Sequence, residues 1–282
     1  MNDTTNRYLK TVDDLEYITG IAWSMSINTH GRDVNSWRFE YCSYVFGKLC
    51  LHANAILQLI PEIDTKERYS KSIWNISSIA VLIRALIETY YVFFYLGVDN
   101  VTDEELEFRH RLWKYHGKKE RLDMLRIIES TDPVVTKLTK DVEILRDSVI
   151  THTLYQSLES SIKKKIRRGE MGILHKNSEL SKRAGIDPNY YNSEYKYLSA
   201  YAHATPFAYS QLNIFRAGDA ASLAVIRTIL EVGTAYLCHA VRDFVKIMPD
   251  QEKDLDERAK ELVDIWDDIC RNVTKQNLEE ER

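Results

Sequence analysis

The chain has 282 residues and a formal net charge of −4, with only 10 glycines, 5 prolines and 4 cysteines. So few turn-forming residues exclude a sheet-rich fold, and the mild negative charge argues against a protein that binds nucleic acid through its overall field. We therefore predict an all-α protein, a multi-helix bundle with an amphipathic helix at its C-terminus.

Apolar residues recur at helical spacing along most of the chain, and polar, glycine or proline breaks separate them into elements. Thr102 with Glu105 three residues later forms a capping box, which is typical of a helix start. The predicted helices cover 12–24, 36–60, 68–97, 102–130 with a break near Gly117, 133–162, 188–204, 219–246 and 250–282.

The predicted domain organisation follows from these elements. Residues 1–35 form a polar N-terminal segment with one short helix, and residues 36–249 form a single helical-bundle domain. Within that domain, glycines, a proline and a basic cluster predict a long mobile loop at about 163–187. Residues 250–282 form an amphipathic helix that packs on the domain or on a second copy of it.

The predicted helix at 68–97 carries an unusual polar stripe. Five polar residues share one side of this otherwise apolar helix, because they are spaced 7, 4, 3 and 4 residues apart: Ser77, Arg84, Glu88, Tyr91 and Tyr95. A charge in such a run must be paired if it is buried. Two interpretations stay open: an Arg84–Glu88 ion pair that fixes helix register, or one wall of a polar pocket in which Glu88 accepts a proton or orients a partner.

A second candidate lies in the tyrosine-rich stretch EYKYLSAYAHATP at 194–206. Ser199 and His203 are i,i+4 neighbours, and Tyr201 lies between them near the end of a predicted helix. The helix dipole there favours a charged imidazole, and a nearby carboxylate such as Glu88 would favour it further. We therefore predict that His203 meets a polar partner, as a structural hydrogen-bonding residue or as a catalytic one.

Two short motifs carry a resemblance to a known family. R-A-L-I-E at 84–88 and L-S-A-Y-A-H-A-T-P at 198–206 resemble a set of uncharacterised bacterial helical-bundle proteins, classed as a domain of unknown function. Those proteins combine an Arg-x-x-x-Glu helix with a Leu-Ser-x-Tyr-x-His-x-x-Pro segment, and the similar region covers about 35–245. The resemblance implies no established reaction. It does imply that four side chains converge in space: Arg84, Glu88, Ser199 and His203.

A weaker resemblance is to the HEPN-type ribonucleases of toxin and phage-defence systems, whose signature is an Arg and a polar residue followed at short distance by a His. Arg146-Asp147 with His152 fits this pattern, and Arg111 with His116 fits it more loosely. The resemblance implies a metal-independent reaction in which residues of two protomers position a ribose 2′-hydroxyl and stabilise charge on the phosphate. Because the pattern is short, chance matches are expected.

The run KKKIRR at 163–168 holds five positive charges in six residues. It is either a solvated surface or a contact site for the phosphates of RNA. No aromatic residues alternate with the cations to stack bases, which weakens the nucleic-acid interpretation. The cations are Lys163, Lys164, Lys165, Arg167 and Arg168.

Metal and nucleotide sites have little support in the sequence. Glu107 and His110 form one E-x-x-H motif, which is half of what a di-iron bundle site needs, and no second copy occurs. The cysteines and histidines lack zinc spacing, and no glycine-rich phosphate loop is present. We predict no metal and no cofactor.

The run at 76–98 is long enough to span a bilayer, but Arg84 and Glu88 near its middle would be penalised there. We predict a cytoplasmic protein with no membrane partner. The first functional hypothesis is a binding module with an internal polar pocket for a small polar ligand or a protein partner and a regulatory role. The alternative is a HEPN-like RNA endonuclease, and dimerisation through apolar helix faces fits either hypothesis.

Overall fold

The structure is a computed structural model that describes residues 3–32, 36–61, 74–203, 205–214 and 219–280, with only the backbone of 212–214 and 273–280. Every regular element within these ranges is helical, so the protein is an all-α multi-helix bundle, as the sequence predicted. The elements are α1 (Asp3–Thr29), α2 (Trp37–Leu59), α3 (Ile76–Phe93), the π-helical turn η1 (Phe94–Val98), α4 (Asp103–Ile127), α5 (Val134–Ile150), α6 (Thr153–Ser157), α7 (Ser160–Arg168), α8 (Asn177–Arg183), α9 (Pro188–Ala202), α10 (Pro206–Ile214), α11 (Ala220–Ile247), the 3₁₀ turn η2 (Pro249–Asp254) and α12 (Glu257–Glu280).

The chain divides into two compact units, where the sequence suggested one bundle domain. The larger unit combines residues 1–98 with residues 177–282, and the smaller unit is formed by residues 99–176. The smaller unit therefore interrupts the larger one along the sequence. It contains α4 to α7, and the larger unit contains the remaining helices.

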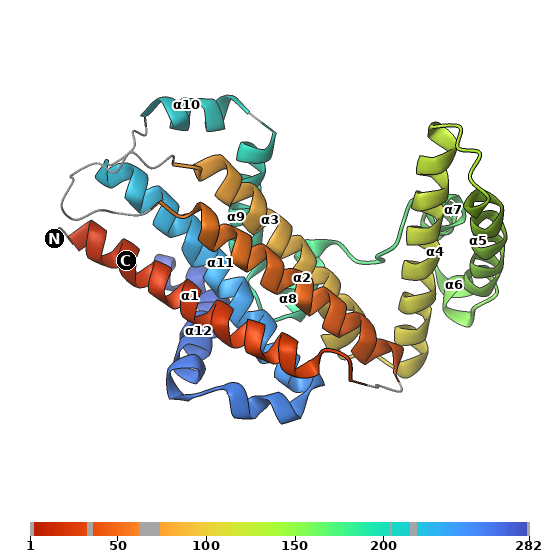
Figure 1. Ribbon diagram of the computed structural model, residues 1–282, viewed down its shortest axis with the longest axis horizontal. Helices are drawn as coiled ribbons and strands as arrows, with labels where there is room; N and C mark the ends of the chain where they lie inside the picture. The colour runs from red at the N-terminus through yellow and green to blue at the C-terminus, as the bar shows by residue number, and fades with distance from the viewer. Residues whose placement is uncertain (1–2, 33–35, 62–73, 204, 215–218, 281–282) are drawn as a thin grey trace. The chain divides into compact units, whose positions relative to one another are not determined.

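Four long helices form the centre of the larger unit. In Figure 1, α1, α2, α3 and α11 run alongside one another, and each packs on at least two of the others. α9 packs on α3, and α12 packs on α11. The segments Ile76–Val98 and Ala220–Ile247 are long and apolar enough to cross a membrane, but 67% of the most apolar stretch of each is buried inside the structure, as in the core helices of a soluble protein.

Aromatic packing and one close backbone approach fix this core. The ring of Phe46 in α2 stacks on that of Phe244 in α11, with centroids 3.9 Å apart. Gly97 lies in η1, where a β-carbon would overlap the Sγ of Cys42, so only glycine fits at this position. Arg38 Nε donates to the Gly97 carbonyl at 2.8 Å, which ties α2 to the turn that ends the long apolar segment.

α1 extends well beyond the short helix predicted at 12–24. Its buried face packs on α11 and includes Leu15, Ile18 and Ala22, and the hydroxyl of Tyr8 donates to the Pro61 carbonyl at 2.9 Å. Packing against α11 therefore offsets the weak helix propensity of the polar N-terminal residues. The predicted helix start at residue 68 lies outside the described residues.

In the smaller unit, α4 and α5 pack side by side. The predicted N-cap at Thr102 is confirmed, because the backbone N–H of Glu105 donates to Thr102 Oγ1 at 3.2 Å. The reciprocal half of the capping box is not seen among the described contacts, since the Glu105 carboxylate accepts from Arg109 one turn further on. The break expected near Gly117 is absent, since α4 runs through it without interruption. A glycine inside a helix costs about 1 kcal/mol, which the burial of Leu112 and Tyr115 in the preceding turns offsets.

The basic segment is helical, so the prediction of an irregular loop over about 163–187 is wrong for most of its length. α7 covers the whole KKKIRR run, and α8 covers Asn177–Arg183. Ile166 on the inner side of α7 is fully buried in the apolar cluster of the smaller unit. Gly169, with φ of 74°, then ends the helix in the left-handed conformation. The sequence showed the glycines and charges, but not the packing of this one isoleucine.

Candidate functional site

The predicted Arg84–Glu88 pair exists and has a third member from α9. Arg84 Nη2 lies 3.1 Å from Glu88 Oε1 and donates to the Tyr195 hydroxyl at 2.9 Å. The same hydroxyl donates to Glu88 Oε1 at 2.7 Å, and the guanidinium carbon lies 5.0 Å from the Tyr195 ring centre. One tyrosine thus bridges both charges and fastens α9 to α3.

This triad is less buried than the sequence suggested. The side chain of Arg84 is 22% exposed and that of Glu88 is 45% exposed, so water reaches both. The hydrogen bond to Tyr195 raises the pKa of Arg84, and partial burial together with the bond to Glu88 raises the pKa of Tyr195. Arg84 therefore stays charged and the Tyr195 hydroxyl stays neutral at neutral pH, which suits a positioning cluster.

The other members of the predicted stripe do not join the triad. Tyr91 is buried and its hydroxyl lies 3.0 Å from that of Tyr236 on α11. Tyr95 is fully buried, whereas Ser77 is half-buried in the first turn of α3. One of the two interpretations made the stripe a wall of a pocket, but its C-terminal part, with Tyr91 and Tyr95, is helix–helix packing.

α9 carries the second group of predicted residues, and its ends are well defined. Asp187 accepts from the backbone N–H of Asn189 at 2.7 Å, and Pro188 occupies the first turn, so the helix starts there. At the other end, the His203 N–H donates to the Ser199 carbonyl at 3.1 Å. α10 begins at Pro206, three residues after His203.

A hollow of about 510 Å³ lies along α9 and the start of α10, and we call it the α9–α10 pocket. Its walls are made by aromatic rings, alanine and the aliphatic parts of polar side chains. The lining residues are Ser193, Lys196, Tyr197, Ser199, Ala200, His203, Thr205 and Phe207. Of the predicted site residues, Ser199 and His203 thus come together here.

Two polar groups in this pocket differ in their surroundings. The Oγ of Ser199 is shielded from water and makes no hydrogen bond to any described residue. The imidazole of His203 is exposed, although the sequence predicted that it meets a polar partner. Tyr201, the third residue predicted here, is buried, and its hydroxyl lies 3.2 Å from that of Tyr197. It therefore does not line the pocket itself but holds the lining residue Tyr197 in place.

The predicted convergence of all four motif residues takes a looser form in the structure. Among the described residues, no hydrogen bond joins Arg84 or Glu88 to His203. Tyr195, which binds the charge pair, lies one helical turn before Ser199 and two turns before His203. The triad holds the middle of α9, and the pocket lies along the last turns of the same helix.

The residues of the nuclease hypothesis have local partners in the smaller unit. Arg146 contacts its neighbour Asp147 at 3.2 Å. His152 caps α6, since its Nδ1 accepts from the Leu154 N–H at 3.2 Å, and its ring lies 4.9 Å from that of Phe108. His116, in the looser match, bonds through Nδ1 to the Gly169 carbonyl at 2.6 Å. These contacts give both histidines a structural role.

The E-x-x-H motif also has a structural explanation. Glu107 forms an ion pair with Arg111, one turn further along α4, which lowers the pKa of Glu107. Burial lowers the pKa of His110 to about 4, so that its imidazole is neutral at pH 7. Within the described part of the chain, no three His, Cys, Asp or Glu residues are grouped so as to hold a metal ion.

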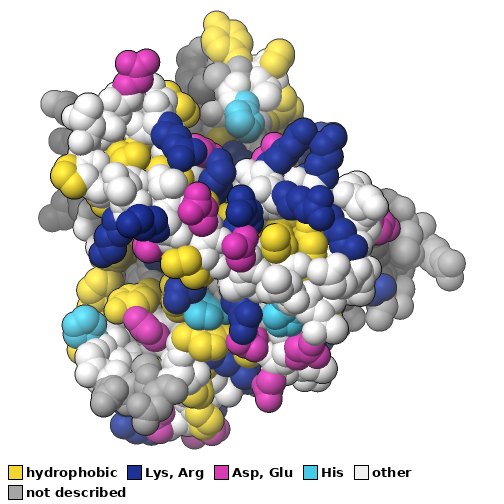
Figure 2. Space-filling view, turned by 90° about the vertical axis from the view of Figure 1, so that its right-hand side faces the viewer, with side chains coloured by type: hydrophobic (Ala, Val, Ile, Leu, Met, Phe, Trp, Pro, Cys, Tyr) yellow, Lys and Arg dark blue, Asp and Glu magenta, His cyan; other side chains and the backbone are white. Residues whose placement is uncertain are grey.

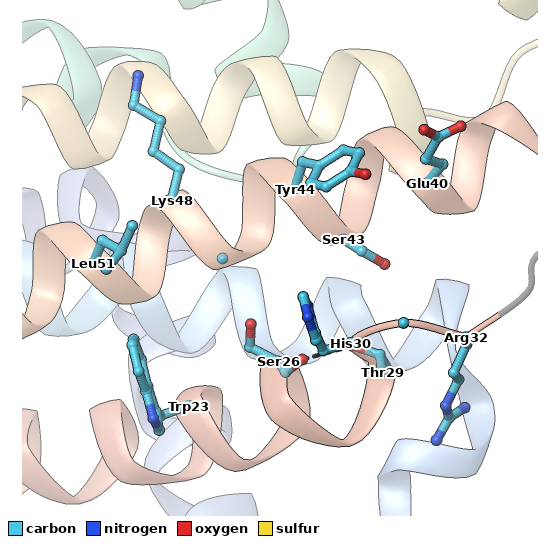
Figure 3. Close-up of a pocket in the computed structure, with 12 residues that line it drawn as sticks. Trp23, Ser26, Thr29, His30, Arg32, Glu40, Ser43, Tyr44, Lys48 and Leu51 are labelled. Atoms are coloured by element: carbon cyan, nitrogen blue, oxygen red, sulfur yellow. Dashed lines mark hydrogen bonds between the residues drawn. The ribbon is translucent and has the colours of Figure 1, made fainter.

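The structure also contains a groove that the sequence did not reveal. It lies between α1 and α2 and has a volume of about 460 Å³. In Figure 3, Trp23 on α1 and His30 just after the end of α1 point toward α2, whereas Lys48 points away. Trp23 is 41% exposed and Tyr44 is 67% exposed. The sequence did offer a signal for this groove. Trp23 and Tyr44 lie in helices whose other apolar residues already supply the buried faces of α1 and α2.

A buried charge network in α11 was also missed. Asp243 is fully buried and accepts from Arg242 at 2.9 Å, from Lys246 at 2.8 Å and from the Tyr90 hydroxyl at 2.9 Å. Arg242 also pairs with Asp267, which anchors α12. Burial raises the pKa of Asp243, but Arg242 and Lys246 outweigh it and hold that pKa below its usual value. The network is a structural anchor inside the bundle.

The comparisons with known proteins place the chain in a family without adding an activity. The DUF5677 family, described as a family of unknown function, matches residues 39–234. No curated protein and no solved structure matches the chain. The matched region runs from α2 into α11 and contains both the Arg84–Glu88 helix and the segment with Ser199 and His203. The match covers more than half of the chain, which therefore belongs to the DUF5677 family of unknown function.

Proposed function

We propose that the protein is a cytoplasmic binding module whose α9–α10 pocket takes a small organic acid, with an apolar body and one anionic group. The observation that carries this proposal is the pocket itself, a hollow of about 510 Å³ whose wall contains Ser199 with a covered, unpartnered hydroxyl. Pockets of this size, with mainly apolar walls and few polar groups, are typical of small-ligand sites.

The chemistry of the lining supports an anionic ligand. Lys196 is exposed at the pocket, and within the described part of the chain no carboxylate pairs with it. His203 lines the same hollow and adds a ring N–H that can donate to an anionic group. Tyr197 and Phe207, whose rings lie 5.9 Å apart, offer a surface for the apolar part of the ligand.

The position of the pocket within the fold supports the same conclusion. A buried hydroxyl that lacks a partner costs free energy, and rotation of the Ser199 side chain toward the pocket would let a ligand oxygen or nitrogen supply the missing bond. The Arg84–Glu88–Tyr195 triad holds α9 one turn away, so the pocket is built on a fixed helix. Four buried free thiols, Cys42, Cys50, Cys238 and Cys270, support a reducing compartment such as the cytoplasm.

The test uses three carboxylates as probes: hexanoate, benzoate and 4-phenylbutyrate. Each is compared with the corresponding primary amide, which has the same apolar body and no charge. Isothermal titration calorimetry should show that the carboxylates bind more tightly than the amides. Lys196→Gln should weaken carboxylate binding about two- to fivefold, as for one exposed charge pair, and leave the amides unchanged. Lys182→Gln on α8, also exposed, is the matched control and should change neither.

Two results would count against the proposal. One is that no carboxylate of the set binds at millimolar concentration. The other is that Lys196→Gln and Lys182→Gln weaken carboxylate binding equally, because then only the overall charge of the protein matters.

A further inference from the structure

The basic run forms one continuous charged face of α7. Four cations and the first residue of the helix follow one another at i, i+3, i+4, i+7 and i+8, which places them on the same side. They line a shallow hollow of about 470 Å³ that no carboxylate lines. The five lining residues are Ser160, Lys163, Lys164, Arg167 and Arg168. Lys165, predicted with the others, lies off this face. In Figure 2, Lys and Arg side chains are numerous on the face shown, with Asp and Glu side chains between them.

The local contacts leave most of this charge available. Lys163 Nζ donates to the Gln156 carbonyl at 2.7 Å, and Lys163 and Arg167 both approach the buried Tyr155 ring, at 5.7 Å and 5.9 Å. Arg168 has only a loose contact of 3.6 Å with exposed Glu170. None of these contacts neutralises the four cations as a group, so an external anion would be attracted to them.

The opposite side of α7 decides which kind of polyanion fits. Ile166 is fully buried and Ile162 packs against the same apolar cluster, so the apolar side of the helix is already used inside the smaller unit. A helix that binds a membrane surface needs that side for insertion between lipids. Paired lysines and paired arginines one turn apart suit a row of phosphates instead, because arginine binds phosphate through two parallel hydrogen bonds.

We infer that the α7 face binds the phosphate backbone of a nucleic acid without reading its sequence. The four cations would contact successive phosphates, and the N-terminal turn at Ser160 adds backbone N–H groups at the end of the row. No exposed aromatic ring lines the hollow, so base stacking contributes nothing and affinity comes from counterion release. The inference does not depend on the α9–α10 pocket.

The test measures fluorescence anisotropy of a labelled RNA oligonucleotide and of a labelled DNA duplex with the full-length chain, over a series of salt concentrations. Lys164→Gln with Arg168→Gln removes two exposed cations. It should weaken binding roughly tenfold and reduce the slope of log K against log salt by about 1.5. Lys137→Gln with Lys140→Gln on α5 removes the same charge from exposed positions in the same unit and should leave both values nearly unchanged.

A second variant guards against loss of folding. Ser160→Glu places a negative charge in the first turn of α7, where the helix dipole favours it, and also inside the hollow. It should keep the helix and still weaken binding. Three outcomes would overturn the inference: no binding to either nucleic acid, equal losses in the two double variants, or binding to phosphatidylserine vesicles in place of nucleic acid.

Discussion

Two charge clusters of the larger unit look alike in sequence and differ in the structure. Arg84 and Glu88 lie in an apolar stretch of α3, and Arg242 and Asp243 lie in an apolar stretch of α11. Glu88 is 45% exposed, whereas Asp243 is completely buried. A charge within an apolar stretch therefore signals a partner in both cases, but it does not tell how much water the pair has lost.

The difference assigns the clusters different roles. Around Asp243, three donors from α3 and α11 surround one carboxylate, and Arg242 connects it to α12. Around Glu88, a single tyrosine connects two helices at a surface that water reaches. We expect the first cluster to determine stability, and the second to position α9 at little energetic cost.

The largest effect is expected from Asp243→Ala. It leaves Arg242 and the Tyr90 hydroxyl without their main acceptor in a buried site, so the free energy of unfolding should fall by about 3–5 kcal/mol. Urea denaturation followed by circular dichroism measures it. A loss below about 1 kcal/mol would show that the network is not the anchor that its burial suggests.

An intermediate effect is expected from pH at His239, next to this network. Burial, followed by the charge of Arg242, lowers the pKa of His239 to about 3, so its imidazole is neutral at pH 7 and its 3.6 Å approach to Asp267 is not an ion pair. The unfolded chain takes up a proton near pH 6.5 and the folded chain does not. The free energy of unfolding should therefore fall as the pH drops from 6.5 toward 3, by at most about 1.4 kcal/mol per unit.

Other groups titrate in the same range, so the contribution of His239 needs a variant. The pKa of His110 is also lowered, to about 4. His239→Gln should make the slope between pH 6 and pH 4 shallower by close to one proton. An unchanged slope would mean that the folded protein accommodates a charged imidazole at position 239.

The smallest effect is expected from Glu88→Gln. The amide oxygen can still accept from Tyr195, and the lost ion pair is partly exposed, so the free energy of unfolding should change by less than about 1 kcal/mol. Urea denaturation under the conditions used for Asp243→Ala makes the comparison direct. A loss as large as that of Asp243→Ala would remove the distinction between the two clusters.

The helices could largely be predicted from the sequence, because spacing and capping are local. α2, α9 and α11 begin and end within two residues of their predicted bounds, and the Thr102 cap is confirmed. Failures occurred where packing outweighs local preference. α1 is longer than its polar sequence suggests, and α7 forms in a run of like charges because Ile166 is buried on the other side.

The site could be predicted only in part. The i,i+4 spacing of Ser199 and His203 placed them together, and both line the α9–α10 pocket. The partner of Arg84 and Glu88 was missed, because Tyr195 is one of many tyrosines in α9 and only the packing of α9 on α3 selects it. Lys196 was missed for a similar reason, since an exposed lysine is ordinary until a hollow lies beside it.

The most direct test of the proposed pocket is to map where a small organic acid binds. Backbone amide shifts of the isotope-labelled protein, followed by NMR during titration with 4-phenylbutyrate, report this residue by residue. The account predicts that the changes concentrate at Lys196, Ser199 and Ala200 and at Phe207 on α10. Changes confined to the α1–α2 groove, at Trp23 and Tyr44, would contradict it.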